Sequence, residues 1–286
     1  MASETIGVVG AGMMGSEIAL VFALAGHPVL ISDRNRADVE KAVTKLEAVL
    51  DKGIKRGFYT DDQKAAALAN LNIVDGLDAY ADCGLIIEAI FEDETAKGEI
   101  FERLDAVTAP GCILASNTSS ISITVLSSYV SPERRKRFLG THFFSPVSRM
   151  KLVEVIPGID TDPEVADGVA ARLEAIGKAP IRVKDVVGFA VNRLIHIFWI
   201  EAVRLVEEGV VSPADLDTGC KLGLGHPVGP FELMDAVTNN LTLDVQAILH
   251  EAYGDRFRPR PLLKQMVKAG YNGRRYDRGW YHYNDD

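Results

Sequence analysis

The chain contains little cysteine and lacks the excess of basic residues that nucleic-acid binding favours. Its three cysteines, Cys83, Cys112 and Cys220, are too few and too scattered among 286 residues for a disulfide framework or a zinc site. This usage predicts a reducing cytoplasm and no metal centre. The formal net charge of −9 argues against nucleic acid as a partner, although a local basic patch can still bind an anionic ligand.

Long apolar runs are also absent from the sequence. No uninterrupted apolar stretch approaches the roughly 20 residues that a membrane helix needs. The apolar N-terminal segment contains Glu17, follows Glu4 and has no cationic start, so a signal peptide is not expected. Hydrophobic residues at 47% and charged residues at 25% are typical of a soluble protein without a membrane partner. The length allows one large domain or two moderate ones.

Short β-branched segments alternate with helical periodicity through about residue 185. They predict the strands TIGVV, PVLISD, NLNIV, GLIIEAI, GCILASN, RFLGTHFF, KLVEVI and APIRV. Such continuously apolar strands are typical of a sheet covered by helices on both faces. Beyond KDVVGFAVNR the pattern is helical, with a long helix over about 191–208 and another that Ser212 caps. The sequence therefore predicts an α/β domain over 1–187 and an all-helical domain over 188–286.

A helical hairpin over about 36–70 interrupts the alternation of strands and helices. Thr60 and Gln63 have the spacing of a capping box and predict the start of its second helix. In its first helix, apolar residues recur at three- and four-residue spacing: Val39, Val43, Leu46, Leu50 and Ile54. Insertions of this kind often serve a ligand.

A glycine-rich turn, Gly10-x-Gly12-x-x-Gly15, lies between the first strand and the first helix. The first glycine permits a tight turn, the second lets the backbone approach a pyrophosphate, and the third allows close helix–strand packing. The motif in this context predicts a Rossmann-like, doubly wound sheet that binds a dinucleotide. The residues predicted to bind the cofactor here are Gly10, Gly12, Met13, Met14, Gly15 and Asp33.

Asp33 ends the second strand, 18 residues after Gly15. A carboxylate at this place binds the adenosine ribose hydroxyls and repels a 2′-phosphate, which favours NAD over NADP. Arg34 and Arg36 follow directly and weaken that discrimination. The alternative interpretation is a glycine turn with a solvent-facing aspartate.

His142 lies near the end of one predicted strand, and Glu154 lies in the middle of the next. Taken alone, a histidine in an aromatic strand is more often a core residue, and Glu154 suits a solvent-facing position. Oxidation of a secondary alcohol by hydride transfer, however, needs a base for the hydroxyl proton, and imidazole titrates near neutrality. A neighbouring carboxylate would set its tautomer, so the two residues form a candidate acid/base pair.

Six segments carry a resemblance to a known family: GAGMMGSEIA, IIEAIFED, ASNTSSISIT, GTHFFSPVSRMKLVEVIPG, GFAVNRL and LGLGHPVGPFELMD. In this order and spacing they resemble the L-3-hydroxyacyl-CoA dehydrogenase family, above all its short bacterial 3-hydroxybutyryl-CoA members. The resemblance covers nearly the whole chain. It implies an NAD-dependent interconversion of an L-3-hydroxyacyl-CoA and the 3-ketoacyl-CoA, by a homodimer that the helical domain builds.

The resemblance also implies roles for single residues. His142 would be the general base in oxidation and the general acid in reduction, with Glu154 orienting it. Ser119 and Asn192 would donate hydrogen bonds to the substrate oxygen. Without the family, both would be interpreted as turn and helix-cap residues.

Further positions would contact the cofactor or the substrate. Glu92 and Lys97, together with Ser119, match positions that contact the nicotinamide nucleotide, although the residues alone suggest a solvated helix start. In the family the hairpin contacts the CoA moiety and the closing segment also contacts ligand. The basic residues available for these contacts are Lys52, Lys55 and Arg56 in the hairpin and Arg275 in the segment GRRYDRGWYHY.

The chain departs from the family at several ligand-side positions. Val49 stands where some relatives have a hairpin serine, and the segment AVTNNLTLD replaces a glycine-leucine-aspartate turn. The pair Tyr276-Asp277 in the closing segment also differs from the usual residues. Ser145, which multifunctional relatives share, and Val187, which changes only local stiffness, differ without obvious chemical effect. The departures in the hairpin, the helical domain and the closing segment leave open a second hypothesis, the same hydride transfer on a CoA-free hydroxy acid or aromatic alcohol. A third is a non-catalytic NAD-binding protein.

Overall fold

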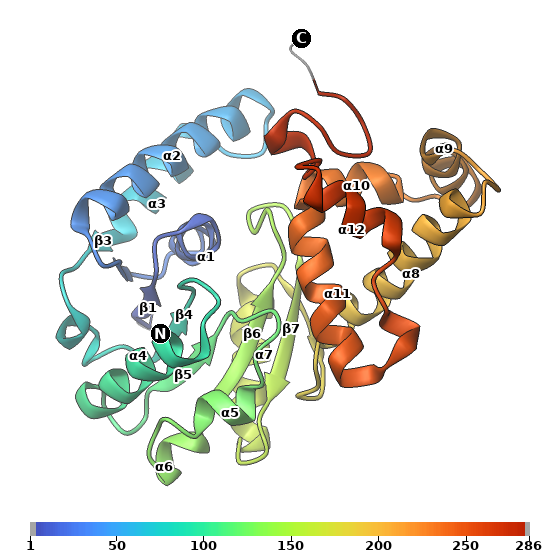
Figure 1. The fold of residues 1–286 in the computed structure, drawn as a ribbon. Coiled ribbons are helices and arrows are strands. Elements are labelled where there is room, and N and C mark those ends of the chain that lie inside the picture. Colours follow the sequence, from blue (N-terminus) through green and yellow to red (C-terminus); the bar gives the residue numbers. More distant parts are fainter. Residues whose placement is uncertain (1–3, 284–286) are drawn as a thin grey trace. The chain divides into compact units, whose positions relative to one another are not determined.

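The computed structural model describes residues 4–283 and divides the chain into two compact units, one ending at Val186 and one beginning at Val187 (Figure 1). The first unit contains an eight-stranded sheet in the order β3-β2-β1-β4-β5-β6-β7-β8. The strands are β1 (Ile6–Val9), β2 (Val29–Ser32), β3 (Leu71–Ile73), β4 (Leu85–Glu88), β5 (Ile113–Ser116), β6 (Phe138–Phe143), β7 (Leu152–Pro157) and β8 (Ala179–Arg182). All neighbours are parallel except β6 and β7. The predicted α/β class and its eight strands are confirmed.

Helices cover both faces of this sheet, as the continuously buried strands β1, β4, β5 and β6 require. The helices α1 to α3 lie on one side and α4 and α5 on the other (Figure 1). The helices are α1 (Met13–Leu24), α2 (Arg36–Lys55), α3 (Asp61–Asn70), α4 (Glu94–Val107), α5 (Ile123–Ser127), α6 (Pro132–Arg135) and α7 (Pro163–Ala175), with a 3₁₀ turn η1 (Leu77–Tyr80). The strand order reverses between β1 and β4, and ligands of such sheets bind where the order reverses.

The helices α2 and α3 form the hairpin between β2 and β3. The Thr60 hydroxyl accepts a hydrogen bond from the Gln63 amide, and the Gln63 side chain accepts one from the Thr60 amide, so the capping box is present. Leu46 and Leu50 are buried on the inner face of α2. Lys52, Lys55 and Arg56 lie at the C-terminal end of α2, where they are exposed.

Among its described residues, the second unit has no β-strand and is built of helices. They are α8 (Val191–Glu207), α9 (Pro213–Gly223), α10 (Pro230–Val237), α11 (Asn239–Tyr253) and α12 (Pro261–Lys268), with the 3₁₀ turns η2 (Asp255–Phe257) and η3 (Arg274–Tyr276). Trp199, Val203, Phe231 and Met234 form its core. Between residues 4 and 283, no helix combines the length and the apolarity that crossing a membrane requires.

The closing segment of the chain packs against α10 around Asp235, which is fully buried. Its carboxylate accepts hydrogen bonds from the Trp280 and Tyr281 amides, the Tyr283 hydroxyl and the Asn239 side chain, at 3.0–3.1 Å. The segment leaves no room for side chains at its glycines, because a Cβ on Gly279 would lie 2.0 Å from the Asp235 carboxylate. This segment is therefore an integral part of the helical unit.

The segment that replaces the family's glycine-leucine-aspartate turn joins α10 to α11. Thr238 has a φ of 105° there, a conformation that favours glycine and strains a β-branched residue. Its amide still donates to the Met234 carbonyl, and its carbonyl accepts from the Thr242 amide and hydroxyl. The departure from the family thus retains a turn at the cost of backbone strain at one residue.

His196 makes the stability of the protein depend on pH. It is 4% exposed and packs edge-on against Trp199, and burial lowers its pKa from 6.5 to about 4. Since the unfolded chain binds a proton near pH 6.5 and the folded state only near pH 4, stability is lost as the pH falls through this window. We expect the free energy of unfolding to fall by about 2 kcal/mol between about pH 7.5 and about pH 5 through this residue.

Urea denaturation of the wild type and of His196→Leu at the two pH values measures this contribution. The variant is expected to show an acid loss smaller by about 2 kcal/mol. An equal loss in both proteins would contradict the assignment.

Candidate active site

The glycine-rich turn connects β1 to α1, and each glycine has its own structural reason. Gly10 has a φ of 104°, and a Cβ on Gly15 would lie 2.0 Å from the Gly10 carbonyl oxygen. A Cβ on Gly12 would meet nothing within 4 Å, because Gly12 faces an open cavity at the N-terminus of α1. Met13 is exposed beside this cavity, whereas Met14 packs against the core. Space and backbone amides at a helix N-terminus suit a pyrophosphate.

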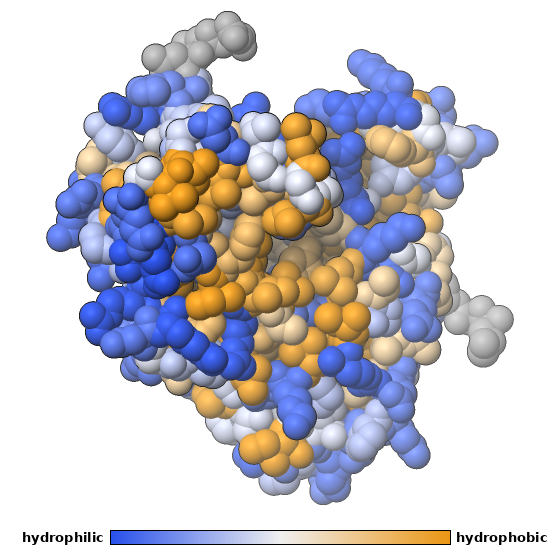
Figure 2. All heavy atoms as spheres, turned by 90° about the vertical axis from the view of Figure 1, so that its right-hand side faces the viewer, coloured by the Kyte–Doolittle hydropathy of each residue, from blue (hydrophilic) through white to orange (hydrophobic). Residues whose placement is uncertain are grey.

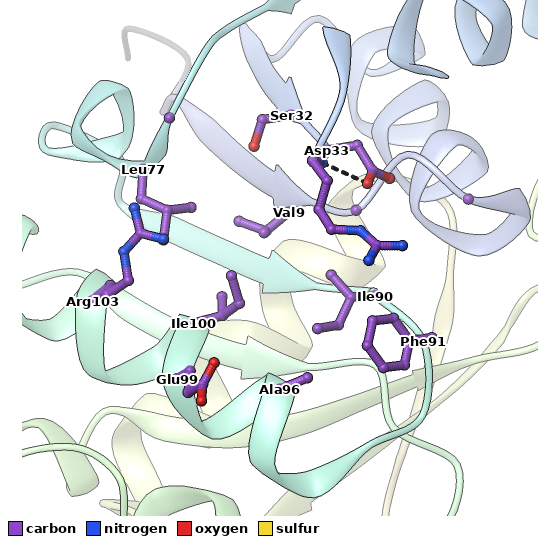
Figure 3. Close-up of a pocket in the computed structure, with 14 residues that line it drawn as sticks. Val9, Ser32, Asp33, Leu77, Ile90, Phe91, Ala96, Glu99, Ile100 and Arg103 are labelled. Atoms are coloured by element: carbon purple, nitrogen blue, oxygen red, sulfur yellow. Dashed lines mark hydrogen bonds between the residues drawn. The ribbon is translucent and has the colours of Figure 1, made fainter. Parts of the chain in front are cut away.

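A cavity of about 580 Å³ lies along the carboxyl ends of β1, β2 and β4 (Figure 3). Asp33 lies at one side and accepts hydrogen bonds from the Ala11 amide and the Arg34 amide, both at 2.7 Å. Apolar side chains lie between Asp33 and Arg103 in this view: Val9, Ile90 and Ile100. Apolar walls with a carboxylate at the end of β2 fit an adenosine whose ribose hydroxyls donate to Asp33.

The two arginines after Asp33 have other partners. The Arg34 guanidinium lies 5.6 Å from the ring centroid of Phe91. Arg36 pairs with Glu40 at 3.2 Å and with Asp75 at 2.9 Å. Because two carboxylates engage Arg36, this cation compensates a 2′-phosphate less than its sequence position suggests, whereas Arg34 lines the cavity beside Asp33. The arrangement favours NAD.

Removal of the Asp33 charge is expected to relax cofactor choice. In Asp33→Ser, the ratio of kcat/KM for NADH to that for NADPH should fall about a hundredfold. The serine side chain can neither bind both ribose hydroxyls nor repel a 2′-phosphate as the carboxylate does. Steady-state kinetics with both cofactors measure the ratio. Asp38→Asn, which changes an exposed carboxylate paired with Lys41, is the matched control. An unchanged ratio in Asp33→Ser would contradict the role of Asp33.

His142 and Glu154 lie directly opposite each other on the antiparallel strands β6 and β7. The His142 Nδ1 lies 2.7 Å from the Glu154 Oε2. Glu154 is fully buried and His142 is 7% exposed, so Glu154 does not occupy the solvent-facing position that its strand pattern allowed. A carboxylate bound at Nδ1 selects the tautomer protonated there and leaves Nε2 to exchange the second proton.

Lys97 is buried rather than solvated, which excludes the alternative interpretation as an exposed helix start. Its Nζ lies 2.7 Å from the Glu88 Oε1 and 3.4 Å from the Glu92 Oε2. Lys97 and Glu88 are 1% and 0% exposed. Glu88 was not among the residues that the sequence predicts. Its only signal is an acidic residue at the end of the otherwise apolar strand segment GLIIEAI.

Ser119 lies in the turn after β5, and Glu92 binds this turn. The Glu92 Oε1 accepts hydrogen bonds from the Thr118 hydroxyl at 2.6 Å, the Ser119 amide at 2.9 Å and the Ser120 hydroxyl at 2.9 Å. Burial opposes ionisation of Glu92, but the Lys97 charge and these donors outweigh it and lower the pKa of this carboxyl. The structure thus brings Ser119 together with Glu92 and Lys97.

The remaining predicted residues lie on other elements. Lys52, Lys55 and Arg56 lie at the exposed C-terminal end of α2 and take part in none of the ion pairs found among residues 4–283. Asn192 lies in the first turn of α8, and Arg275 lies in η3. Both belong to the second unit.

A mostly parallel sheet with a glycine turn, an acid at the end of β2 and a buried His–Glu pair defines a class, the dinucleotide-dependent dehydrogenases. The family model described as 3-hydroxyacyl-CoA dehydrogenase, NAD binding domain, matches residues 5–186, and the model for the C-terminal domain of the same family matches residues 188–283. The chain belongs to the 3-hydroxyacyl-CoA dehydrogenase family. It is an NAD-dependent oxidoreductase that acts on a CH–OH group.

Individual relatives agree with this assignment. The chain is 39% identical to the probable 3-hydroxybutyryl-CoA dehydrogenase of Deinococcus radiodurans, over 97% of this chain and 99% of the relative. The crystal structure of (S)-3-hydroxybutyryl-CoA dehydrogenase PaaH1 from Ralstonia eutropha matches with a TM-score of 0.94 and 39% identity, over 99% of this chain and all of that chain. A more distant structure, 5-formyl-3-hydroxy-2-methylpyridine 4-carboxylic acid 5-dehydrogenase, matches with a TM-score of 0.80 and 29% identity, over 99% and 91% of the chains.

Proposed function

We propose that this chain oxidises a short-chain L-3-hydroxyacyl-CoA, of the 3-hydroxybutyryl-CoA kind, to the 3-ketoacyl-CoA and catalyses the reverse reduction. The observation that carries the chemistry is the buried His142–Glu154 pair with its 2.7 Å contact. NAD, when bound, accepts the hydride from C3 of the substrate. The hydroxyl proton leaves in the same reaction, and the protein has to supply its acceptor.

In the proposed mechanism His142 accepts this proton at Nε2 during oxidation and returns it during reduction. Glu154 keeps the imidazole in the required tautomer and stabilises the imidazolium that forms. Ser119 donates a hydrogen bond to the substrate oxygen, on which negative charge develops during reduction. Asn192 is proposed as a second donor to the same oxygen.

The end of the hairpin supports a CoA thioester as the substrate. Lys52, Lys55 and Arg56 place three cations there, which suits the phosphates of CoA. Phe58, at the same end, is 60% exposed, and the Arg149 guanidinium lies 5.8 Å from its ring centroid. An exposed aromatic ring among cations is also suited to a nucleobase. We propose Arg275 as a further basic contact to the substrate.

NADH oxidation in the presence of acetoacetyl-CoA tests the proposal, beside free acetoacetate and a panel of aromatic keto acids and aldehydes. Rapid turnover of the thioester, with little of the CoA-free compounds, is expected. Turnover of a CoA-free compound alone would overturn the thioester assignment and favour the second hypothesis, a CoA-free hydroxy acid or aromatic alcohol as the substrate. The similar dehydrogenase named for a pyridine carboxylic acid is an example of an enzyme with such a substrate.

The hairpin contribution can be measured separately. The triple variant Lys52→Ala, Lys55→Ala, Arg56→Ala should raise the KM for acetoacetyl-CoA about tenfold or more and leave the KM for NADH unchanged, because only the CoA phosphates lose a partner. Lys45→Ala removes an exposed cation from the middle of α2 and is the matched control. An unchanged KM in the triple variant would show that the CoA moiety binds elsewhere.

We further propose that the chain forms a homodimer through its helical unit and acts in the cytoplasm. Apolar side chains gather on the face that Figure 2 shows, the side of α8 and α9 in Figure 1. The exposed apolar residues of α8, α9 and the turns that follow them are Leu194, Val210, Leu222 and Leu224. Because a second copy would cover such a surface, sedimentation at micromolar concentration should detect a dimer. Monomer alone would contradict the proposal of a dimer.

The proposed cytoplasmic location rests on the three free, buried cysteines.

A further inference from the structure

We propose that Glu88 is a positioning residue for the nicotinamide half of the cofactor site. It acts through Lys97 on Glu92, and through Glu92 on the turn formed by residues 118–120. The inference rests on the membership of the chain in an NAD-dependent family and not on the identity of the substrate.

The position of Glu88 in the sheet supports this assignment. Glu88 is the last residue of β4, and in register it lies between Val9 of β1 and Ser116 of β5. The strand order reverses between β1 and β4, and a dinucleotide lies across that point. The cavity with Asp33 lies along the carboxyl ends of β1, β2 and β4, so the carboxyl end of β5 and the turn after it are left to receive the other half of the cofactor. Glu88 lies in register beside Ser116, the last residue of β5.

The contacts of Glu88 join three separate elements. Its Oε1 accepts hydrogen bonds from the Ile90 amide and from the Lys97 Nζ, both at 2.7 Å. Its Oε2 accepts one from the Ser116 hydroxyl at 2.6 Å. Ile90 lines the adenosine cavity, Lys97 belongs to α4, and Ser116 leads into the 118–120 turn. Burial raises the pKa of the Glu88 carboxyl, and the Lys97 charge opposes this effect.

Charge alternates along the path from Glu88 to the turn. Lys97 lies between two carboxylates, and Glu92 in turn lies between Lys97 and the amides and hydroxyls of residues 118–120. The Glu92 side chain is 36% exposed and is the member of this group that reaches the surface of the site. Without the Glu88 charge, the buried ammonium has Glu92 as its remaining ion-pair partner and draws it away from the turn. The turn then loses the acceptor that orders it.

The test is a double-mutant cycle with Glu88→Gln and Lys97→Met, read out as the Kd for NADH from its fluorescence without substrate. Glu88→Gln is expected to raise this Kd about tenfold to a hundredfold, the equivalent of one charge-assisted hydrogen bond. Added to Lys97→Met, it should change the Kd less than twofold, because Glu88 acts through Lys97. The kcat should fall in Glu88→Gln and in Lys97→Met, and the double variant should have a kcat close to that of Lys97→Met.

A second, largely buried ion pair of the same unit provides the matched control. Arg134 and Asp105 are joined at 2.9 Å, and their other hydrogen bonds among the described residues go to Ser131, Cys112, Thr108 and Ala109, outside the cofactor site. Asp105→Asn should lower the thermal midpoint much as Glu88→Gln does and leave the Kd for NADH unchanged. If Glu88→Gln does not fold, Glu88→Asp keeps the charge, retracts it by one methylene and should still raise the Kd several-fold.

Two results would overturn the proposal. One is a Kd in the folded Glu88 variant no higher than in Asp105→Asn, which would make Glu88 a structural counter-ion only. The other is a double variant whose Kd for NADH rises by the product of the fold-changes in Glu88→Gln and in Lys97→Met. That result would mean that Glu88 acts independently of Lys97. Because NADH binding is measured without substrate, neither outcome depends on whether the thioester is turned over.

Discussion

Replacement of His142 by alanine is expected to lower kcat about a thousandfold, while the Kd for NADH stays within twofold of the wild type. The imidazole is the proposed acceptor of the hydroxyl proton, and alanine offers no group that can replace it. His142 lies on β6, away from the cavity that contains Asp33, so cofactor affinity should survive. Steady-state kinetics and NADH fluorescence measure the two constants separately.

The neighbouring positions allow a stricter test of the pair. Glu154→Gln keeps the shape and removes the charge, so kcat should fall about tenfold to a hundredfold, less than in His142→Ala. Thr141 precedes His142 on β6, is fully buried, and its hydroxyl makes no hydrogen bond among the described residues. Thr141→Val should therefore leave kcat unchanged. A His142→Ala enzyme that keeps a tenth of the activity would exclude His142 as the acid/base.

Replacement of Asp235 by alanine is expected to destabilise the helical unit by about 3–5 kcal/mol. The substitution removes the acceptor of four buried or half-buried donors, those of Asn239, Trp280, Tyr281 and Tyr283. Burial and the bond to Asp235 raise the pKa of Tyr283, which keeps its hydroxyl protonated as a donor. For a unit of this size the loss corresponds to a fall of the thermal midpoint by more than about 10 °C.

Calorimetry of Asp235→Ala beside Asp244→Asn measures this effect. Asp244 is an exposed carboxylate on the next helix, α11, so its change should alter the midpoint by little. If Asp235→Ala unfolds within about 2 °C of the wild type, the closing segment does not depend on this carboxylate. The segment's resemblance to a family motif would then reflect ligand contact alone.

The fold could be read from local patterns because most of its determinants are local. Continuous apolar strands, the capping box at Thr60 and the turn at Gly10 each act within a few residues, and each is found where it was predicted. The closeness of His142 and Glu154 could also be anticipated, because consecutive strands usually pair. Their facing register, however, depends on the intervening turn, for which the sequence carries no simple rule.

The parts that were missed depend on contacts between segments far apart in the chain. Glu88 and Lys97 are polar residues whose burial follows from the packing of α4 against the ends of β4 and β5. Ile100 and Arg103 line the adenosine cavity from α4 although no motif marks them. Asp235 resembles any helix aspartate until the closing segment folds over it. Periodicity and spacing do not report such relations.

The antiparallel pairing of β6 with β7 has a consequence for how members of such a family diverge. The acid/base pair is specified by backbone register within two buried strands, whereas the basic residues proposed to bind the substrate lie on an exposed helical hairpin. Insertions and substitutions in the hairpin leave the strand register untouched. Substrate range can therefore evolve by surface change alone, while the proton-transfer chemistry is inherited intact.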